Sequence, residues 1–174
     1  MKSIVELARH ELKWTQPKAL KNSFELHSDD QVVGTLVLKS IFGSFATGTS
    51  ADGCWTFKRV GFFQTRVTIR RCDDETDIGT FRNSTWKAGG TLELPDGRKY
   101  RATSNLWQSK LEFQDPSGNP IIKLKTGGLM HLSAGVEIEP AAARIPELPW
   151  MVMLGWYLAV MMKNDSAGAA AAGG

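Results

Sequence analysis

Short runs in which apolar and polar residues alternate fill most of the chain between Leu12 and Glu139, and turn-forming residues separate them. In TLELPDGRKYRAT, for example, Leu92 and Leu94 alternate with polar neighbours, residues 95–97 reverse the chain, and the alternation then resumes. A period of two is typical of half-buried strands, and Pro-Asp-Gly turns join antiparallel ones. The pattern predicts an all-β domain.

The alternation yields about twelve candidate strands, each bounded to within about 2–4 residues. They lie near residues 12–16, 22–28, 31–38, 43–50, 53–60, 62–71, 77–82, 89–94, 98–104, 107–114, 120–125 and 130–139. An open sheet of this size would expose two long edges, so it is expected to close into a barrel or split into a sandwich. Because about eight strands already enclose a packed interior, a wider barrel needs another element to fill it.

The stretch LPWMVMLGWYLAVMM, residues 148–162, contains no charged residue. As a helix it would be about 22 Å long, whereas the hydrocarbon core of a bilayer is about 30 Å thick. Glu147 and Lys163 bracket the stretch, so extending it would draw charges into lipid. A helix that is apolar on every side must otherwise be surrounded by protein. We therefore predict a closed antiparallel β-barrel of about twelve strands with this helix, at about 147–163, threaded through its centre. A tail anchor is the alternative.

Gly155 weakens such a helix by about 1 kcal/mol, a cost that close approach to an inward-facing barrel side chain would explain. The residues predicted to form the core of the helix are Trp150, Met153, Leu154, Gly155, Tyr157 and Leu158.

The length of 174 residues fits a single domain. We expect a lead-in segment at residues 1–11, one barrel domain at 12–164, and a flexible Ala/Gly tail at 165–174, because SAGAAAAGG offers no packing face.

The charged residues Glu6, Arg9 and Glu11 interrupt the apolar core that a signal peptide requires, which favours a cytoplasmic protein. In a reducing cytosol Cys54 and Cys72 are expected to be thiols that act as small packing residues. The hairpin predicted between them would bring them close together, which leaves a disulfide open as an alternative.

A strand-only body followed by a wholly hydrophobic helix resembles the tubby C-terminal-like superfamily, and within it the phospholipid scramblase-like and LURP-one-related branch. The resemblance covers residues 12–163 and rests on VVGTL, DGCWTFKRVGF, IGTF, GTLELPDGRKY and LPWMVMLGWYLAVMM. Tubby domains bind phosphoinositide headgroups and scramblases act at the bilayer. The resemblance therefore implies a protein that associates peripherally with anionic phospholipid or phosphoinositide. Scramblases carry an acidic calcium-binding segment before the last helix, where this chain has only Glu137 and Glu139, so calcium-activated scrambling is not expected.

Basic residues concentrate in FKRVGFFQTRVTIRR, where alternation places Arg66, Thr68 and Arg70 on one strand face and Val67 and Ile69 on the other. Each Lys or Arg near an anionic bilayer contributes about 1 kcal/mol to binding. The candidate headgroup-binding residues are Lys58, Arg59, Arg66, Arg70 and Arg71. The alternative interpretation is a solvated outer barrel face. A second, smaller cluster, Arg98, Lys99 and Arg101, has the same two interpretations.

The sequence contains no recognisable catalytic constellation. His10, His27 and His131 lack the spacing of metal ligands, and the acidic run CDDETD lacks the glycine and terminal glutamate of an EF-hand loop. We expect a non-enzymatic protein without a cofactor or a bound metal, monomeric, and either lipid-binding or engaged with a protein partner. With a net charge of +3 the chain is less basic than a dedicated nucleic-acid binder. The alternative function is a soluble scaffold or a small-ligand or protein-binding barrel without membrane activity.

Overall fold

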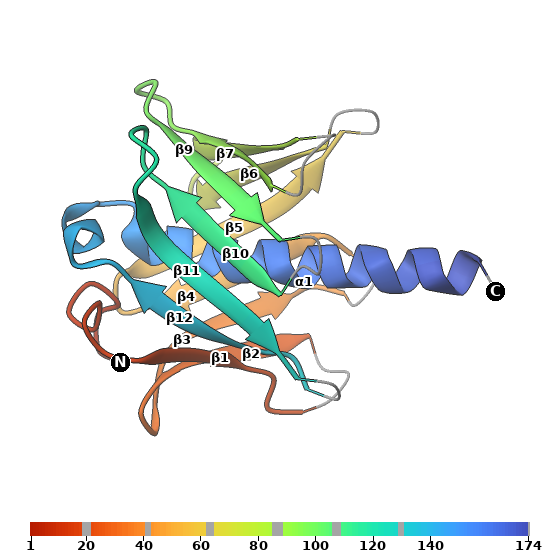
Figure 1. Cartoon of the computed structure of the whole chain (residues 1–174), viewed down its shortest axis with the longest axis horizontal. Helices are drawn as coiled ribbons and strands as arrows, with labels where there is room; N and C mark the ends of the chain where they lie inside the picture. The colour runs from red at the N-terminus through yellow and green to blue at the C-terminus, as the bar shows by residue number, and fades with distance from the viewer. Residues whose placement is uncertain are drawn as a thin grey trace.

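The protein is described by a computed structural model that covers residues 1–18, 22–40, 43–61, 65–84, 89–105, 109–128 and 131–173. Within these residues, twelve antiparallel strands form a closed barrel around one long helix (Figure 1). The strands are β1 (Leu12–Thr15), β2 (Ser23–Ser28), β3 (Gln31–Leu38), β4 (Phe45–Ser50), β5 (Gly53–Val60), β6 (Arg66–Arg71), β7 (Asp77–Asn83), β8 (Gly89–Glu93), β9 (Lys99–Ser104), β10 (Lys110–Gln114), β11 (Pro120–Gly127) and β12 (Ser133–Ile138). The predicted fold class is confirmed.

Every strand pairs with its neighbours in sequence, and β1 closes the barrel against β12 through the register Leu12↔Val136. A 3₁₀-helix, η1 (Pro140–Arg144), follows β12, and the helix α1 (Leu148–Ala172) then runs through the barrel from one end to the other (Figure 1). The end where α1 begins is termed the proximal end, and the end where it leaves is termed the distal end. The up-and-down order places successive connections at alternate ends, so the β2–β3 turn is proximal and the β3–β4 connection is distal.

The inner face of the barrel is built from the apolar residues of each alternating run. In β8 and the turn that follows it, for example, Leu92 and Leu94 are buried while Glu93 between them is partly exposed. The closed sheet has no edge, which removes the unpaired backbone groups that an open sheet would expose.

The helix α1 fills the interior, as predicted. Its residues from Leu148 to Met161 are all buried, and they include the six predicted core residues: Trp150, Met153, Leu154, Gly155, Tyr157 and Leu158. The ring of Trp156 stacks on that of Trp14 in β1, with 5.7 Å between the ring centroids. A β-carbon built on Gly155 would lie 2.8 Å from Leu124 Cδ1, so any larger residue here would require Leu124 to shift.

Lengthwise, α1 differs from the prediction: instead of ending near residue 163 and giving way to a flexible tail, it continues to Ala172. Residues 163–172 are exposed, as the lack of a packing face implies, but they are helical. Alanine has the highest intrinsic helix propensity, and each added residue continues a hydrogen-bonded ladder that the buried half has already nucleated.

Within the described residues, no helix combines the length and the apolar character needed to cross a membrane.

The N-terminal lead-in, residues 1–11, packs on the barrel. Ile4 and Leu7 are buried, the backbone N–H of Ile4 donates to Asp52 Oδ2 over 2.7 Å, and the hydroxyl of Ser3 donates to the same carboxylate. The segment therefore belongs to the same folded unit as the strands.

Candidate functional site

The predicted basic hairpin is formed by β5 and β6, which pair with Lys58 opposite Thr68 and Val60 opposite Arg66. Val67 and Ile69 point into the core, with 1% and 0% of their surface exposed. Lys58, Arg66, Thr68 and Arg70 therefore lie on the outer face, as strand alternation requires. The hydroxyl of Thr68 donates to the carbonyl of Lys58 over 3.3 Å and links the two strands across this face.

Two of the five candidate cations are available to a ligand on this face. Lys58 and Arg66 are exposed, and neither forms an ion pair within the described part of the chain. On the far side of Arg66, directly opposite it in the register, lies Arg82 of β7, whose Nε is 3.5 Å from Glu93 Oε2. Like charges placed directly opposite each other on one face destabilise a sheet. Lys58, Arg66 and Arg82 are termed the basic patch.

Arg59 has a different environment from Lys58, although the two are adjacent in sequence. It turns toward the mouth of the barrel at the distal end, where its Nη1 lies 3.0 Å from Asp165 Oδ1 of α1. The hydroxyl of Tyr157 lies nearby and donates to the carbonyl of Ser44 over 2.6 Å. Burial raises the pKa of Tyr157 to about 12, against the opposing influence of the Arg59 charge. Arg59 therefore helps to hold α1 in the barrel and is not part of the outer patch.

Arg70 and Arg71 are separated from the patch in two ways. Arg70 Nε lies 2.5 Å from Asp77 Oδ1 on the neighbouring strand, and this hydrogen bond raises the pKa of the arginine. Arg71 is exposed at the proximal end of β6, next to the acidic turn at residues 72–76. The structure thus leaves Lys58 and Arg66 together and places the other three candidates elsewhere.

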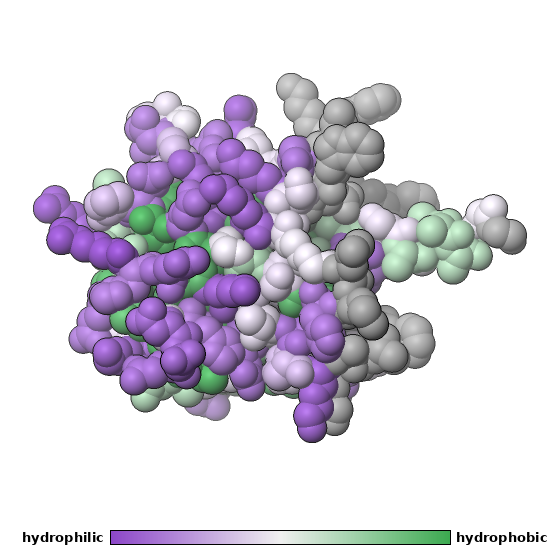
Figure 2. Space-filling view, turned by 60° about the horizontal axis from the view of Figure 1, so that its bottom comes forward, coloured by the Kyte–Doolittle hydropathy of each residue, from purple (hydrophilic) through white to green (hydrophobic). Residues whose placement is uncertain are grey.

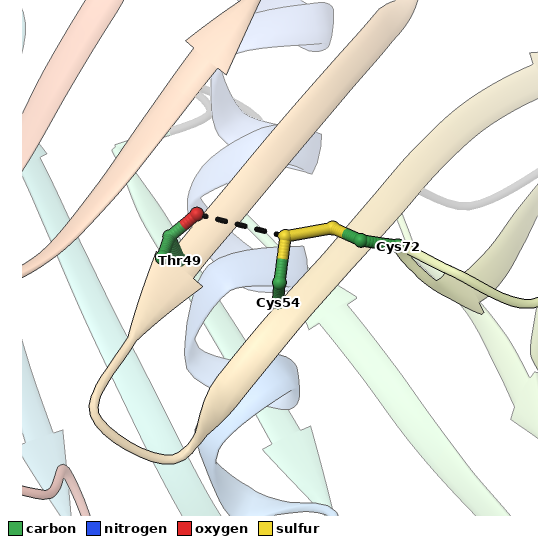
Figure 3. Close-up of a disulfide and its surroundings, with 3 residues drawn as sticks. All are labelled: Thr49, Cys54 and Cys72. Atoms are coloured by element: carbon green, nitrogen blue, oxygen red, sulfur yellow. Dashed lines mark hydrogen bonds between the residues drawn. A yellow bond between two sulfur atoms is a disulfide. The ribbon is translucent and has the colours of Figure 1, made fainter.

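The proximal base of the same hairpin is closed by a disulfide between Cys54 and Cys72 (Figure 3). The expectation that both cysteines are thiols is therefore wrong, and the alternative, a disulfide between them, is the one observed. The strand register sets Trp55 opposite Arg71, so the residues beside them, Cys54 and Cys72, also lie opposite each other. Their Cα atoms are 5.4 Å apart, within the range that a disulfide requires. Thr49 Oγ1 of β4 lies 3.7 Å from Cys54 Sγ.

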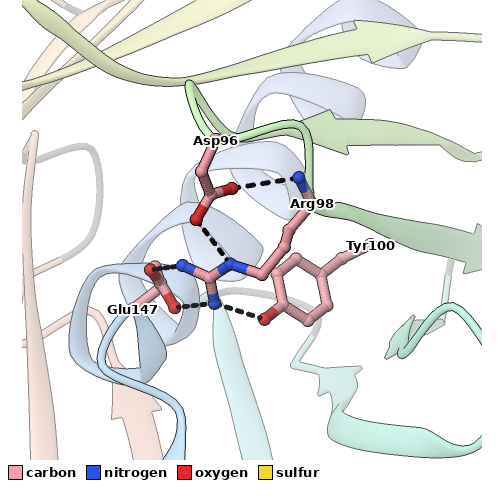
Figure 4. A network of polar contacts seen from close by, with 4 residues as sticks. All are labelled: Asp96, Arg98, Tyr100 and Glu147. Atoms are coloured by element: carbon pink, nitrogen blue, oxygen red, sulfur yellow. Dashed lines mark hydrogen bonds and ion pairs between the residues drawn. The ribbon is translucent and has the colours of Figure 1, made fainter.

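The second basic cluster is divided as well. Arg98 donates to both carboxylate oxygens of Glu147, over 2.6 and 3.2 Å, and through Nε to Asp96 over 2.7 Å (Figure 4). Its third contact is with the hydroxyl of Tyr100, at 3.4 Å. These hydrogen bonds raise the pKa of Arg98, and the bond to Glu147 has a larger effect than the bond to Asp96. Because Glu147 immediately precedes α1, Arg98 ties the β8–β9 hairpin to the start of the helix.

The rest of that cluster lines an open groove of about 510 Å³ between the β8–β9 and β10–β11 hairpins. Lys99 Nζ lies 3.3 Å from Glu93 Oε1, and Arg101 is exposed without an ion pair among the described residues. The lining comprises Thr91, residues 99–101, Gln114 and residues 115–118. Most of these lining residues are polar or charged.

Arg82 is the member of the basic patch that the sequence does not single out. It stands in FRN, outside the basic hairpin, and only the pairing of β6 with β7 places it opposite Arg66.

Comparison of the chain with protein-family models, with curated proteins and with solved structures gives no match.

Proposed function

We propose that this chain is a non-enzymatic, tubby-like and scramblase-like barrel that binds anionic lipid headgroups at a membrane surface. The observation that carries the proposal is the basic patch, in which Arg66 faces Arg82 and Lys58 is the diagonal neighbour of Arg66 across the β5–β6 pair. Diagonal neighbours on one sheet face lie about 7–8 Å apart, within reach of one headgroup phosphate or of two adjacent ones.

An anionic ligand changes the energetics of this face. Without a ligand, Arg66 and Arg82 repel each other. A bound phosphate would neutralise that repulsion and accept charge-assisted hydrogen bonds from the guanidinium groups. The contact involves headgroups and not acyl chains, because the patch lies on a hydrophilic outer face. Binding through exposed charges is screened by salt, so it should weaken steeply as ionic strength rises.

The test is cosedimentation of the purified chain with phosphatidylcholine vesicles and with vesicles that also contain phosphatidylserine or a phosphoinositide, over a salt series. The wild-type chain is expected to bind only the anionic vesicles and to dissociate as salt rises. Lys58→Gln/Arg66→Gln/Arg82→Gln should weaken binding at least tenfold, since each cation contributes about 1 kcal/mol.

The matched control is Lys2→Gln/Arg71→Gln/Arg101→Gln, which removes three exposed cations outside the patch. It should retain most of the affinity. An equal loss in both triple variants would mean that net charge, and not the patch, governs binding. A wild-type chain that binds neither kind of vesicle at low salt would eliminate the proposed function.

The groove between the β8–β9 and β10–β11 hairpins favours a second candidate, a soluble barrel that binds a small polar ligand or a protein loop without membrane activity. Vesicle binding separates the two candidates. If the chain stays in the supernatant, the groove becomes the site to test, through ligand-induced changes in the NMR signals of Tyr100 and Gln114.

A further inference from the structure

The two ends of the barrel differ in charge. Each of the five β-turns at the proximal end contains an aspartate: Asp29, Asp52, Asp73, Asp96 and Asp115. The connection from β12 to α1, at the same end, contains Glu139 and Glu147, which pair with Lys123 and Arg98. Several of these carboxylates also order their own turns. Asp115 Oδ1, for instance, accepts from the backbone N–H groups of Ser117 and Asn119, both over 2.9 Å.

The distal end carries exposed cations at the strand ends and where the helix leaves the barrel: Lys18, Lys39, Arg66, Arg82, Lys110 and Lys163. These six are termed the distal ring. The carboxylates in this half of the molecule are largely engaged: Asp165 pairs with Arg59, Glu112 lies 3.5 Å from Lys110 Nζ, and Glu25 lies 3.0 Å from His27 Nε2. A surface with a cationic ring at one end and acidic turns at the other has a fixed preference for how it approaches an anionic plane.

The exposed half of α1 projects from the distal end of the barrel (Figures 1 and 2). Its charged residues, Lys163 and Asp165, lie where it leaves the barrel, and residues 166–172 beyond them carry no charge. At about 1.5 Å per residue these seven residues extend about 10 Å. Because these residues are uncharged, their entry into the headgroup region carries no cost of charge desolvation.

We propose that the barrel docks end-on, with its distal end against an anionic bilayer and its axis close to the membrane normal. This inference rests on the proposed function and specifies its geometry. Arg66 and Arg82 of the basic patch belong to the distal ring, the ring contacts headgroups on all sides, and residues 166–172 enter the interface. The acidic proximal turns face away from the membrane because an anionic surface repels them.

Orientation can be measured with an environment-sensitive fluorophore attached to a cysteine that is introduced at one of three exposed positions while the native disulfide is kept intact. Ser84→Cys reports on the distal end, Ala170→Cys on the projecting helix, and Ser117→Cys on the proximal end. With vesicles of phosphatidylcholine and phosphatidylserine, the labels at residues 84 and 170 should shift to shorter emission wavelengths and be quenched by lipids brominated in their acyl chains. The label at residue 117 should change in neither respect.

The outcomes distinguish this inference from the proposed function. A bound protein whose label at residue 117 responds, or in which none of the three labels responds, would overturn end-on docking and leave headgroup binding intact. A protein that does not bind would remove both. Cosedimentation of each labelled protein, compared with unlabelled wild type, establishes that the label itself does not drive binding.

A second variant tests the ring away from the basic patch. Lys39→Gln/Lys110→Gln/Lys163→Gln should weaken binding to the same anionic vesicles at least tenfold, because all three cations face the bilayer in the end-on geometry. Side-on binding through the patch alone would leave its affinity equal to that of the Lys2→Gln/Arg71→Gln/Arg101→Gln control, and this result would contradict the inference.

Discussion

The two halves of α1 are continuous in backbone and differ in almost everything else. Residues 148–161 are buried on all sides by the barrel, whereas residues 163–172 contact little and are exposed. The first half contains Pro149 and Gly155 together with large aromatic and thioether side chains, and the second half is mainly alanine.

The difference shows that the same secondary structure can have two separate causes. In the buried half, tertiary packing overrides the cost of a glycine, since most helical stability in proteins comes from packing. In the exposed half, intrinsic propensity suffices because the preceding turns have already paid the cost of nucleation. Substitutions should therefore have large effects on folding in one half and small effects in the other.

Overpacking is the strongest way to test this contrast. Gly155→Trp should destabilise the protein by at least about 1–3 kcal/mol, because a β-carbon alone would lie 2.8 Å from Leu124 Cδ1 and 3.2 Å from Phe113 Cε2. Gly168→Trp places the same side chain on the exposed half, where nothing lies within 4 Å, and should change the free energy of unfolding by less than about 0.5 kcal/mol. Urea unfolding of both variants measures the difference. Equal stabilities would mean that α1 does not occupy the barrel.

The hydroxyl of Tyr157 offers an intermediate perturbation near the boundary between the halves. Tyr157→Phe removes its 2.6 Å hydrogen bond to the carbonyl of Ser44 and should cost about 1 kcal/mol at neutral pH. The folded-state pKa of about 12 lies above the ordinary value of 10.0. Between these values the folded chain keeps a proton that the unfolded chain has lost, so this contribution to stability is complete below pH 10 and declines as pH rises toward 12.

The measurement is thermal unfolding of wild type and Tyr157→Phe over the alkaline range. The stability difference between them should narrow as pH rises from 10 to 12. A difference that stays constant across this window would show that the hydroxyl is not buried.

The smallest effect is expected at the ion pair where the helix leaves the barrel. Asp165→Asn removes the partner of Arg59, and because Asp165 is mostly exposed the cost should fall within about 0–1 kcal/mol. Amide hydrogen exchange should nevertheless quicken in residues 163–172, since the pair ties the exposed half to β5. Unchanged exchange in that segment, or a global loss of stability, would contradict this assignment.

Much of the fold can be predicted from the sequence because its two signals are strong and local. Period-two alternation locates each strand, and fifteen uncharged residues bracketed by Glu147 and Lys163 indicate a helix that must be enclosed. The end of α1 is missed because an alanine run with no packing face has the composition of a tail. Only the helix that precedes it makes this segment helical.

The candidate site is predictable only in part, because its chemistry depends on partners that are remote in sequence. Alternation correctly places Arg66 and Arg70 on one face. The pairing of Arg59 with Asp165, however, spans 106 positions, and the register that sets Arg82 opposite Arg66 includes a bulge in the β6–β7 pair. The Cys54–Cys72 bond depends on register in the same way. A single sequence shows which residues are charged but not which charges are already paired.

Closure of the barrel between its first and last strands has a consequence for synthesis in the cell. Residues 12–15 find their second neighbour only in residues 133–136, and the helix that fills the interior is made later still. Chains emerge from the ribosome with the N-terminus first, and pairings between distant segments form slowly. The inner face of the incomplete sheet therefore stays uncovered until β12 and α1 have been translated. The nascent chain is most prone to aggregate during this interval, so binding by chaperones would protect it most at this stage.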